Sequence, residues 1–159
     1  MSEKYKVLII NGPNLRYIGK REVEIYGKKN MQDVILEMSE YLKKDIMGRV
    51  DIDLFQSNHE GEIIDRLERA WLDKVDGIVI NAGAYTHTSL AIRDCISWIK
   101  IPCVEVHISN LWARKEKIRH HSMLSPICIG VVSGFGIFSY VLGVLALIEY
   151  LDNTKGDNS

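Results

Sequence analysis

Apolar residues fall along this chain in short runs that alternate with longer segments of helical spacing. The run at residues 7–10 is wholly apolar, which is typical of a buried strand. Residues 31–46 follow, with apolar side chains at 34, 35, 38, 41, 42 and 46, the spacing of an amphipathic helix. Asn30 precedes this segment and Asp33 lies three residues further on, a pairing that predicts reciprocal capping of the helix N-terminus.

The alternation of strand and helix continues to the end of the chain. We expect strands at residues 7–10, 50–54, 77–80, 102–106 and 127–132, and helices at residues 31–46, 62–72, 89–99 and 137–150. Repeated strand–helix units join parallel strands by right-handed crossovers and cover both faces of the sheet with helices. The predicted fold is therefore α/β, a flavodoxin-like three-layer sandwich with a five-stranded parallel sheet and helices on both faces.

Length and composition fit one domain. The 159 residues are 47% hydrophobic and 26% charged, and a chain of this size can bury a sufficient core without a metal or a disulfide. No linker, repeat or low-complexity segment divides the sequence. We therefore expect a single domain over residues 1–159, with a frayed polar tail at about residues 152–159.

Charge and cysteine content narrow the classes of function. The chain carries 20 Lys and Arg residues against 21 Asp and Glu residues, interspersed along its length, so we expect no nucleic-acid partner. Cys95, Cys103 and Cys128 are odd in number and lie in apolar runs, which indicates buried thiols in a reducing compartment. Residues 7–10 are too few for the core of a signal peptide, and these features together predict a cytoplasmic protein.

One uncharged stretch, residues 122–148, is long enough to cross a bilayer. Pro126 and the glycines at 130, 134, 136 and 143 divide it into a β-branched piece, a turn and a helical piece. No Lys or Arg cluster flanks its far end, so we expect no association with a membrane.

Polar residues follow four of the predicted strands, at the edge where a parallel sheet binds ligands. These clusters are residues 11–14, 56–60, 81–88 and 107–110, and they carry amide, hydroxyl and imidazole groups. Two connections, residues 11–29 and 109–125, are also longer than ordinary strand-to-helix turns. Both contain arginines, and the second is a local basic patch, so we interpret them as loops that could close over an anion.

The motifs of several common chemistries are missing. The first long loop has no phosphate-loop spacing, the histidines show no metal-ligand pattern, and no serine elbow or strand-end cysteine suggests a nucleophile. Acid–base chemistry on an anionic substrate remains.

Glu105 and His107 are two apart on one predicted strand, so the carboxylate can orient the imidazole as a general acid. Tyr26 lies five positions after Arg21, whose guanidinium could lower the pKa of the phenol and make it a base.

Each of these assignments has a purely structural alternative. His107 could be a strand-end histidine with its hydrogen bonds satisfied, and Tyr26 could be a packing residue.

Several long motifs resemble those of the type II 3-dehydroquinate dehydratases. The matching segments are residues 11–15 (NGPNL), 19–22 with Tyr26 and Gly27, 55–61 (FQSNHEG), 80–89 (INAGAYTHTS) with Arg93 and Asp94, and 102–110 (PCVEVHISN). They occur in order over about residues 6–151. The resemblance implies a catalytic domain that removes water from 3-dehydroquinate to give 3-dehydroshikimate through an enolate, without metal or cofactor. The reaction would serve the shikimate route to chorismate and aromatic amino acids, or the breakdown of quinate.

The resemblance also implies catalytic roles. Tyr26 would be the base that takes the C2 proton, and Arg21 would keep it ionised and support the transition state. Asn14 would help to hold the enolate through a water molecule. His107 would protonate the departing C1 hydroxyl, and Glu105 would orient His107.

Substrate-binding residues and an assembly carry over in the same way. The binding residues are Asn81, His87, Ile108, Ser109 and Arg119, with Asp94 reaching across from a neighbouring subunit. A substrate with one carboxylate and several hydroxyls suits Ser109 and the Ile108 backbone N–H as the anion site and the others as a polar rim. Family members form dodecamers built from trimers, and the same homo-oligomer is implied here.

The chain departs from the family pattern at four places. Val23 stands where many members have proline, and Trp112 and Ser139 stand where histidine and glycine are common. The segment 114–121 is one residue longer than the usual pattern, which bears on the assignment of Arg119.

The competing class of function is a non-catalytic flavodoxin-like module. An inactive ligand-binding relative would be favoured by loss of Tyr26, Arg21 or His107, and all three are present. A receiver-type regulatory domain needs acidic residues where Asn11 and Asn81 stand, so we exclude it.

Overall fold

The structure of the protein, a computed structural model, describes residues 4–20, 22–42 and 44–156. A parallel sheet with the strand order β2-β1-β3-β4-β5 forms its centre. The strands are β1 (Tyr5–Asn11), β2 (Val50–Gln56), β3 (Gly77–Asn81), β4 (Cys103–His107) and β5 (Gly130–Ser133). The predicted five-stranded flavodoxin-like sheet is confirmed.

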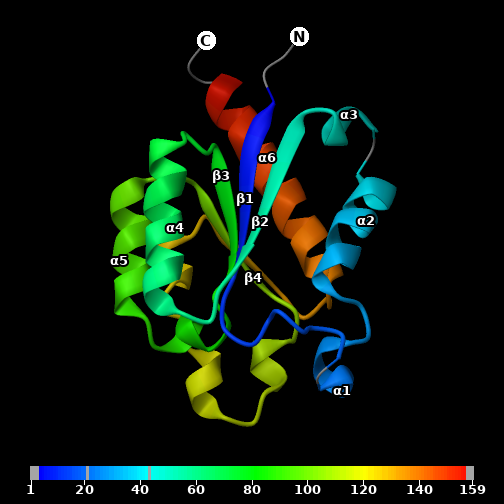
Figure 1. Ribbon diagram of the computed structural model, residues 1–159, viewed down its shortest axis with the longest axis vertical. Coiled ribbons are helices and arrows are strands. Elements are labelled where there is room, and N and C mark those ends of the chain that lie inside the picture. Colours follow the sequence, from blue (N-terminus) through cyan, green and yellow to red (C-terminus); the bar gives the residue numbers. More distant parts are fainter. Residues whose placement is uncertain (1–3, 21, 43, 157–159) are drawn as a thin grey trace.

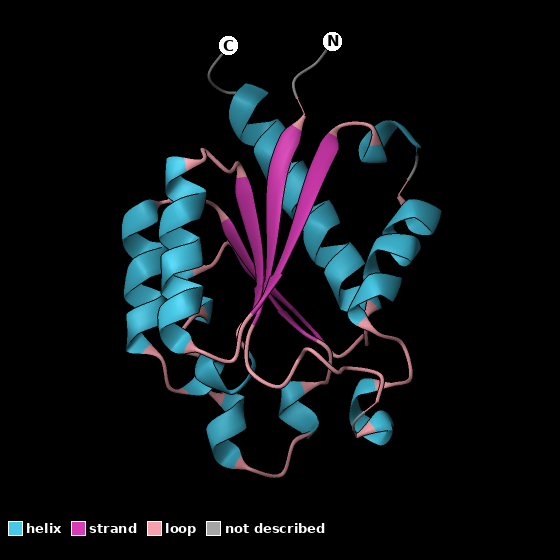
Figure 2. Ribbon diagram, viewed as in Figure 1, coloured by secondary structure: helices cyan, strands magenta, loops and turns pink. Residues whose placement is uncertain are grey.

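Helices cover both faces of this sheet (Figures 1 and 2). They are α1 (Val23–Tyr26), α2 (Met31–Tyr41), α3 (Lys44–Met47), α4 (Glu60–Leu72), α5 (Leu90–Ile99) and α6 (Phe138–Gly156). Short 3₁₀ helices fill the connections: η1 (Gly83–His87), η2 (Leu111–Ala113), η3 (Lys117–His120) and η4 (Ser125–Ile127). On one face, Met38 of α2 and Tyr140 of α6 belong to one core cluster. On the other, Ile63 of α4 and Ile92 of α5 belong to a second, so the three predicted layers are present.

The helix predicted at residues 31–46 is two helices. The predicted cap is confirmed, because the Asn30 side chain accepts from the backbone N–H groups of Gln32 and Asp33 while the Asp33 carboxylate accepts from the Asn30 N–H. Leu42 adopts an extended backbone conformation and buries its side chain, which is 2% exposed. Helix α2 therefore ends at Tyr41, before the helical pattern in the sequence does.

The strand predicted at residues 127–132 begins only at Gly130. Residues Ser125–Ile127 form η4 instead. Pro126 has no N–H to donate to a neighbouring strand, which favours a turn there over a sheet ladder.

The polar tail expected from residue 152 is helical as far as Gly156, and residues 157–159 lie outside the described part of the chain. Asp152 accepts hydrogen bonds from the Tyr5 hydroxyl at 2.8 Å and from Arg49 Nη2 at 2.5 Å. The expectation of a tail that frays from residue 152 is wrong because these contacts attach the end of α6 to the start of β1 and to the turn before β2.

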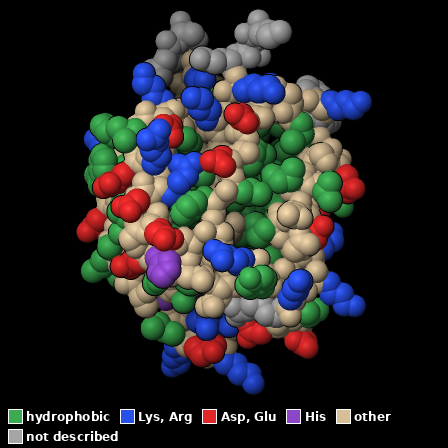
Figure 3. Space-filling model, in the orientation of Figure 1, with side chains coloured by type: hydrophobic (Ala, Val, Ile, Leu, Met, Phe, Trp, Pro, Cys, Tyr) green, Lys and Arg blue, Asp and Glu red, His purple; other side chains and the backbone are tan. Residues whose placement is uncertain are grey.

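The surface agrees with the even charge balance. Figure 3 shows Lys, Arg, Asp and Glu side chains interspersed over one face of the molecule. Among the described residues, none of the helices has the length and hydropathy that a bilayer span requires. Cys95 and Cys103 are buried thiols, as predicted, whereas Cys128 is partly exposed.

Gly12 follows β1 at a point where the backbone of Ala82 approaches closely. A Cβ atom at residue 12 would lie 2.3 Å from the Ala82 carbonyl oxygen. Gly12→Ala is therefore expected to destabilise the fold by about 1–3 kcal/mol, measured from the urea unfolding midpoint. Gly61→Ala is the matched control, since a Cβ there meets nothing within 4 Å and alanine favours the helix α4. Equal midpoints for the two variants would contradict the close approach.

Candidate active site

A pocket of about 600 Å³ opens beside the carboxyl ends of β1, β3 and β4. Its lining comes from the loops that follow these strands: Pro13, Asn14, Leu15, Asn81, Gly83, Ala84, His107, Ile108, Ser109, Leu111, Arg114 and Arg119. Six residues that the sequence singled out thus lie around one space: Asn14, Asn81, His107, Ile108, Ser109 and Arg119. The position agrees with the rule that open parallel sheets bind ligands at the carboxyl ends of their strands.

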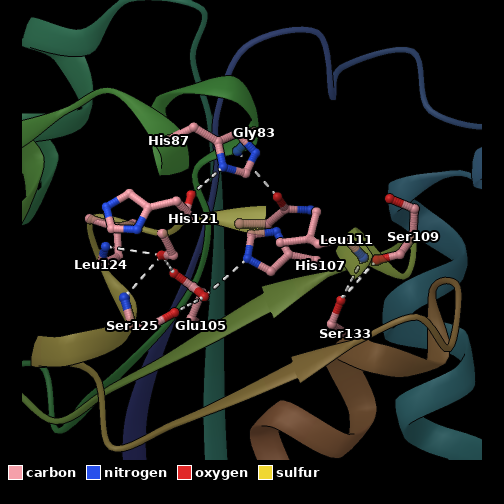
Figure 4. Close-up of polar contacts among 12 residues, drawn as sticks. Gly83, His87, Glu105, His107, Ser109, Leu111, His121, Leu124, Ser125 and Ser133 are labelled. Atoms are coloured by element: carbon pink, nitrogen blue, oxygen red, sulfur yellow. Dashed lines mark hydrogen bonds and ion pairs between the residues drawn. The ribbon is translucent and has the colours of Figure 1, made fainter. Parts of the chain in front are cut away.

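Glu105 and His107 form a buried pair on β4 (Figure 4). The two residues are 1% and 4% exposed, and His107 Nε2 lies 3.2 Å from Glu105 Oε2. In the described part of the chain, Nε2 has no aligned hydrogen-bond partner, so we treat this contact as electrostatic. Because an ionised carboxylate only accepts, it favours a proton on Nε2 and leaves Nδ1 as the ring nitrogen for a bound molecule.

Two serines donate to the carboxylate of Glu105, and Figure 4 shows one of them, Ser125, on the opposite side of the carboxylate from His107. The Ser122 hydroxyl donates to Oε1, and the Ser125 hydroxyl donates to Oε2 at 2.7 Å. Burial raises the pKa of Glu105, but the His107 imidazole and the two serine hydroxyls lower it by more. The net pKa lies below the ordinary value of a glutamic acid, and Glu105 is therefore ionised at neutral pH.

Asn81 lines the pocket from the end of β3, and its amide is held by buried partners. Asn81 Nδ2 donates to the Tyr140 hydroxyl at 3.0 Å, and Oδ1 accepts from the Gly83 N–H at 3.2 Å. The Tyr140 hydroxyl in turn donates to Asn11 Oδ1 at 2.5 Å. Burial raises the pKa of Tyr140, so it stays a neutral phenol that can both accept and donate. The Asn81 amide enters the site with its orientation fixed.

Asn14 lines the pocket from the first long loop, in a left-handed backbone conformation with φ 67°. Asparagine tolerates this conformation better than most residues. Its backbone N–H donates to Asn58 Oδ1 at 3.1 Å, and Gln56 Nε2 donates to the same oxygen. The loop after β2 therefore supports the loop after β1.

The loop after β4 brings two arginines to one side of the pocket. Ile108 is only 3% exposed, so it contributes mainly backbone to the pocket wall. The Ser133 hydroxyl donates to the Ser109 carbonyl oxygen at 3.0 Å and ties this loop to β5. Arg114 and Arg119 complete the pocket on this side, and their guanidinium groups favour a ligand carboxylate.

Of four further residues assigned from the sequence, two lie outside the pocket lining and two cannot be placed from the described part of the chain. His87 is outside the pocket lining, and its Nδ1 lies 2.6 Å from the His121 carbonyl oxygen (Figure 4). Burial lowers the pKa of His87, so the ring is neutral at pH 7 and its Nδ1 carries the proton for this contact. Asp94 is exposed on α5, away from the pocket lining. Arg21 lies outside the described residues, as does the side chain of Tyr26, whose backbone ends α1.

Sequence reasoning missed several residues of the site. Arg114 was not assigned to the site, and the structure places it in the pocket wall. Ser122, Ser125 and Tyr140 were not assigned. All three are polar side chains within the uncharged stretch 122–148. A polar side chain among apolar neighbours is the signal that could have indicated buried polar contacts.

Of three departures from the family pattern, one reaches the pocket and two lie outside its lining. Trp112 is 73% exposed and packs on the His120 ring, with the ring centroids 5.4 Å apart. Arg119 reaches the pocket in spite of the longer segment 114–121. The Ser139 hydroxyl accepts from the Phe135 N–H at 3.0 Å and takes no part in the pocket lining.

The arrangement offers acid–base chemistry on a polar anion. It combines a buried imidazole–carboxylate pair with fixed amides and two guanidinium groups. The described residues contain no group of three or more His, Cys, Asp or Glu side chains placed to bind a metal ion.

Known proteins similar to this chain share one description. Residues 5–148 match the family described as Dehydroquinase class II. The 3-dehydroquinate dehydratase of Caldicellulosiruptor bescii is 53% identical over 147 residues, which cover 92% of this chain and 99% of the relative. That of Gloeothece citriformis is 51% identical and covers 98% of this chain and 99% of the relative. The crystal structure of type II dehydroquinase from Butyrivibrio crossotus superimposes with a TM-score of 0.83 at 43% identity, covering 91% of this chain and 97% of that one.

Proposed function

The chain belongs to the class II dehydroquinase family, and from this premise we propose how its pocket acts as the active site of a 3-dehydroquinate dehydratase. The resemblance expected from the motifs is confirmed. The enzyme is a hydro-lyase that converts 3-dehydroquinate into 3-dehydroshikimate and water on the shikimate pathway toward chorismate and aromatic amino acids. The observation that carries the proposal is the ionised, buried Glu105 beside His107 at the pocket wall.

The elimination requires one proton to leave and one to be delivered. Tyr26, assisted by Arg21, takes the proton from C2, and the electron pair of the C–H bond forms an enolate. Asn14 helps to hold the enolate oxygen, where a donor contributes most because charge develops there. As the C1–O bond breaks, the enolate re-forms the ketone and its electron pair becomes the C1=C2 double bond. The imidazolium form of His107, with Glu105 at its Nε2, gives the Nδ1 proton to the departing hydroxyl, which leaves as water.

Substrate binding uses the two sides of the pocket. Ser109 and the Ile108 backbone N–H receive the carboxylate, close to the arginines of the same loop. Asn81 and Arg119 contact the hydroxyls. His87 completes this rim once substrate is bound, although in the structure it is outside the pocket lining and its Nδ1 lies 2.6 Å from the His121 carbonyl oxygen. No metal or cofactor takes part in these steps.

Replacing Arg119 or Arg114 by alanine is expected to lower kcat/KM by different factors. Arg119→Ala is expected to lower kcat/KM by about 10- to 100-fold, mostly through KM, because a charge-assisted hydrogen bond to substrate is lost. Arg114→Ala should cost less, since the family pattern assigns the hydroxyl contacts to Arg119. Arg69→Ala is the control, an exposed arginine of α4 that pairs with Asp73. If Arg114→Ala lowered kcat/KM by more than Arg119→Ala, the contact with the substrate hydroxyls would belong to Arg114 and not to Arg119.

The proposed reaction is tested by its product. Incubation of the purified protein with 3-dehydroquinate, followed by mass spectrometry and NMR of the small molecules, should show a product lighter by one water that carries a new C=C bond. Unchanged substrate that nevertheless binds to the protein would favour the alternative, an inactive ligand-binding relative.

Assembly and location complete the proposal. The chain acts as a single catalytic domain in the cytoplasm, within a dodecamer of trimers in which Asp94 of one subunit reaches the site of its neighbour. The exposure of Asp94 on α5 supports this, as do the exposed Trp71 and Trp98, whose rings are 5.5 Å apart on α4 and α5. Light scattering should give twelve times the mass of one chain. A monomeric mass with full activity would contradict the contribution of Asp94.

A further inference from the structure

The carboxylate of Glu105 is held at both oxygens by one short segment, residues 122–125 (Figure 4). Ser122 donates to Oε1. Ser125 donates to Oε2 at 2.7 Å, the same oxygen that lies 3.2 Å from His107 Nε2. The three contacts leave the carboxylate little freedom to turn away from the imidazole.

This segment is itself fixed in place. The Ser122 hydroxyl oxygen accepts from the Leu124 and Ser125 backbone N–H groups, each at 3.0 Å, so its one O–H is available for Glu105. The Met123 N–H donates to the Thr86 carbonyl oxygen at 2.8 Å and joins the segment to η1. Segment 122–125 therefore connects the loop that carries Arg119 to the buried acid–base pair.

Two hydroxyl donors, one to each oxygen, favour an ionised partner. A buried carboxyl group with 1% exposure would ordinarily favour its neutral form, and a proton on either oxygen would compete with a serine O–H. We propose that Ser122 and Ser125 are positioning residues of the reaction, which hold the carboxylate of Glu105 directed at His107 so that the imidazole is oriented for proton transfer. The kinetic part of this inference rests on the proposed dehydratase function.

Other titratable groups act on the same pair. Cys103 lies two residues before Glu105 on β4, and its thiol interacts with the Glu105 charge, as does His87 on η1. Both are unchanged by a substitution at Ser125, so a shift in the pH profile of such a variant reports on the serine contact.

Ser125→Ala is the sharper test, because Ser122 also organises the turn. We expect kcat to fall about tenfold or more with KM changed by less than about twofold, and the acidic limb of the kcat profile to move up by about one pH unit. Ser125→Thr keeps the hydroxyl and should restore most of the loss. Ser39→Ala, which removes an exposed hydroxyl that donates to the Leu36 carbonyl oxygen, is the control.

A second readout does not depend on turnover. The infrared C=O band of protonated Glu105, identified by its absence in Glu105→Gln, should appear at higher pH in Ser125→Ala than in the wild-type protein. If Ser125→Ala does not fold, Ser125→Cys, with a weaker donor of similar size, should shift both readouts in the same direction.

An unshifted band together with an unchanged kcat profile in a folded variant would overturn the inference, even if its melting temperature fell. A wild-type protein without turnover would contradict the proposed function, while the band would still test the serine contact.

Discussion

Replacement of His107 by alanine is expected to lower kcat by about 10²- to 10⁴-fold, the usual contribution of a positioned proton donor. His107 lines the pocket, and the ionised Glu105 lies 3.2 Å from its Nε2. Nδ1 is therefore the ring nitrogen from which a proton can pass to a bound molecule. Steady-state kinetics on a folded variant measure the effect. The matched control is His59→Ala, an exposed histidine at the start of α4 whose side chain makes no capping hydrogen bond.

The loss must be separated from damage to the core. Removing the ring leaves Glu105 with only its serine donors, so His107→Gln, which retains an amide donor, serves as a second variant. Partial recovery of His107→Ala by added imidazole would agree with a missing proton donor. Full turnover in either variant would remove His107 from the chemistry.

Replacement of Tyr26 by phenylalanine should lower turnover by a similar or larger factor, because the ring stays while the ionisable oxygen that we propose as the base is lost. Binding of a substrate analogue should change by less than about tenfold, since Phe retains the packing surface. Tyr17→Phe is the control, a 64% exposed tyrosine of the same long loop. Retained turnover in Tyr26→Phe would exclude Tyr26 as the base.

The sequence predicts well those parts of the fold that depend on residues close together in the chain. The cap at Asn30 and the buried strand at residues 7–10 depend on neighbours within a few residues, and both were confirmed. The end of α2 was misplaced because Leu42 continues the helical pattern, although in the fold its burial comes from an extended backbone.

Long-range contacts account for the errors at the C-terminus. Asp152 belongs to a polar sequence that looks free to fray, but its partner Arg49 lies 103 residues away. No pattern near residue 152 contains this information. The helix therefore continues to Gly156 through a contact that only the fold creates.

The candidate site likewise combines features that the local sequence predicts with contacts that only the fold creates. Strand ends predicted which loops would surround a ligand, because parallel strands bring their carboxyl ends to one edge, and six assigned residues line the pocket. The contacts that tune the site lie across larger separations. Ser122 and Ser125 are 17 and 20 residues from Glu105, and Tyr140 is 129 residues from Asn11. None of these three separations follows from helical or strand periodicity.

Ultraviolet absorbance during incubation with 3-dehydroquinate tests the central claim most directly, because dehydration creates a conjugated enone that the substrate lacks. The purified wild-type protein with EDTA present should give a steady rise in absorbance, and His107→Ala should give almost none. This result would establish a metal-independent dehydratase that depends on the imidazole of β4. A wild-type protein that is folded and assembled but produces no rise would contradict the account.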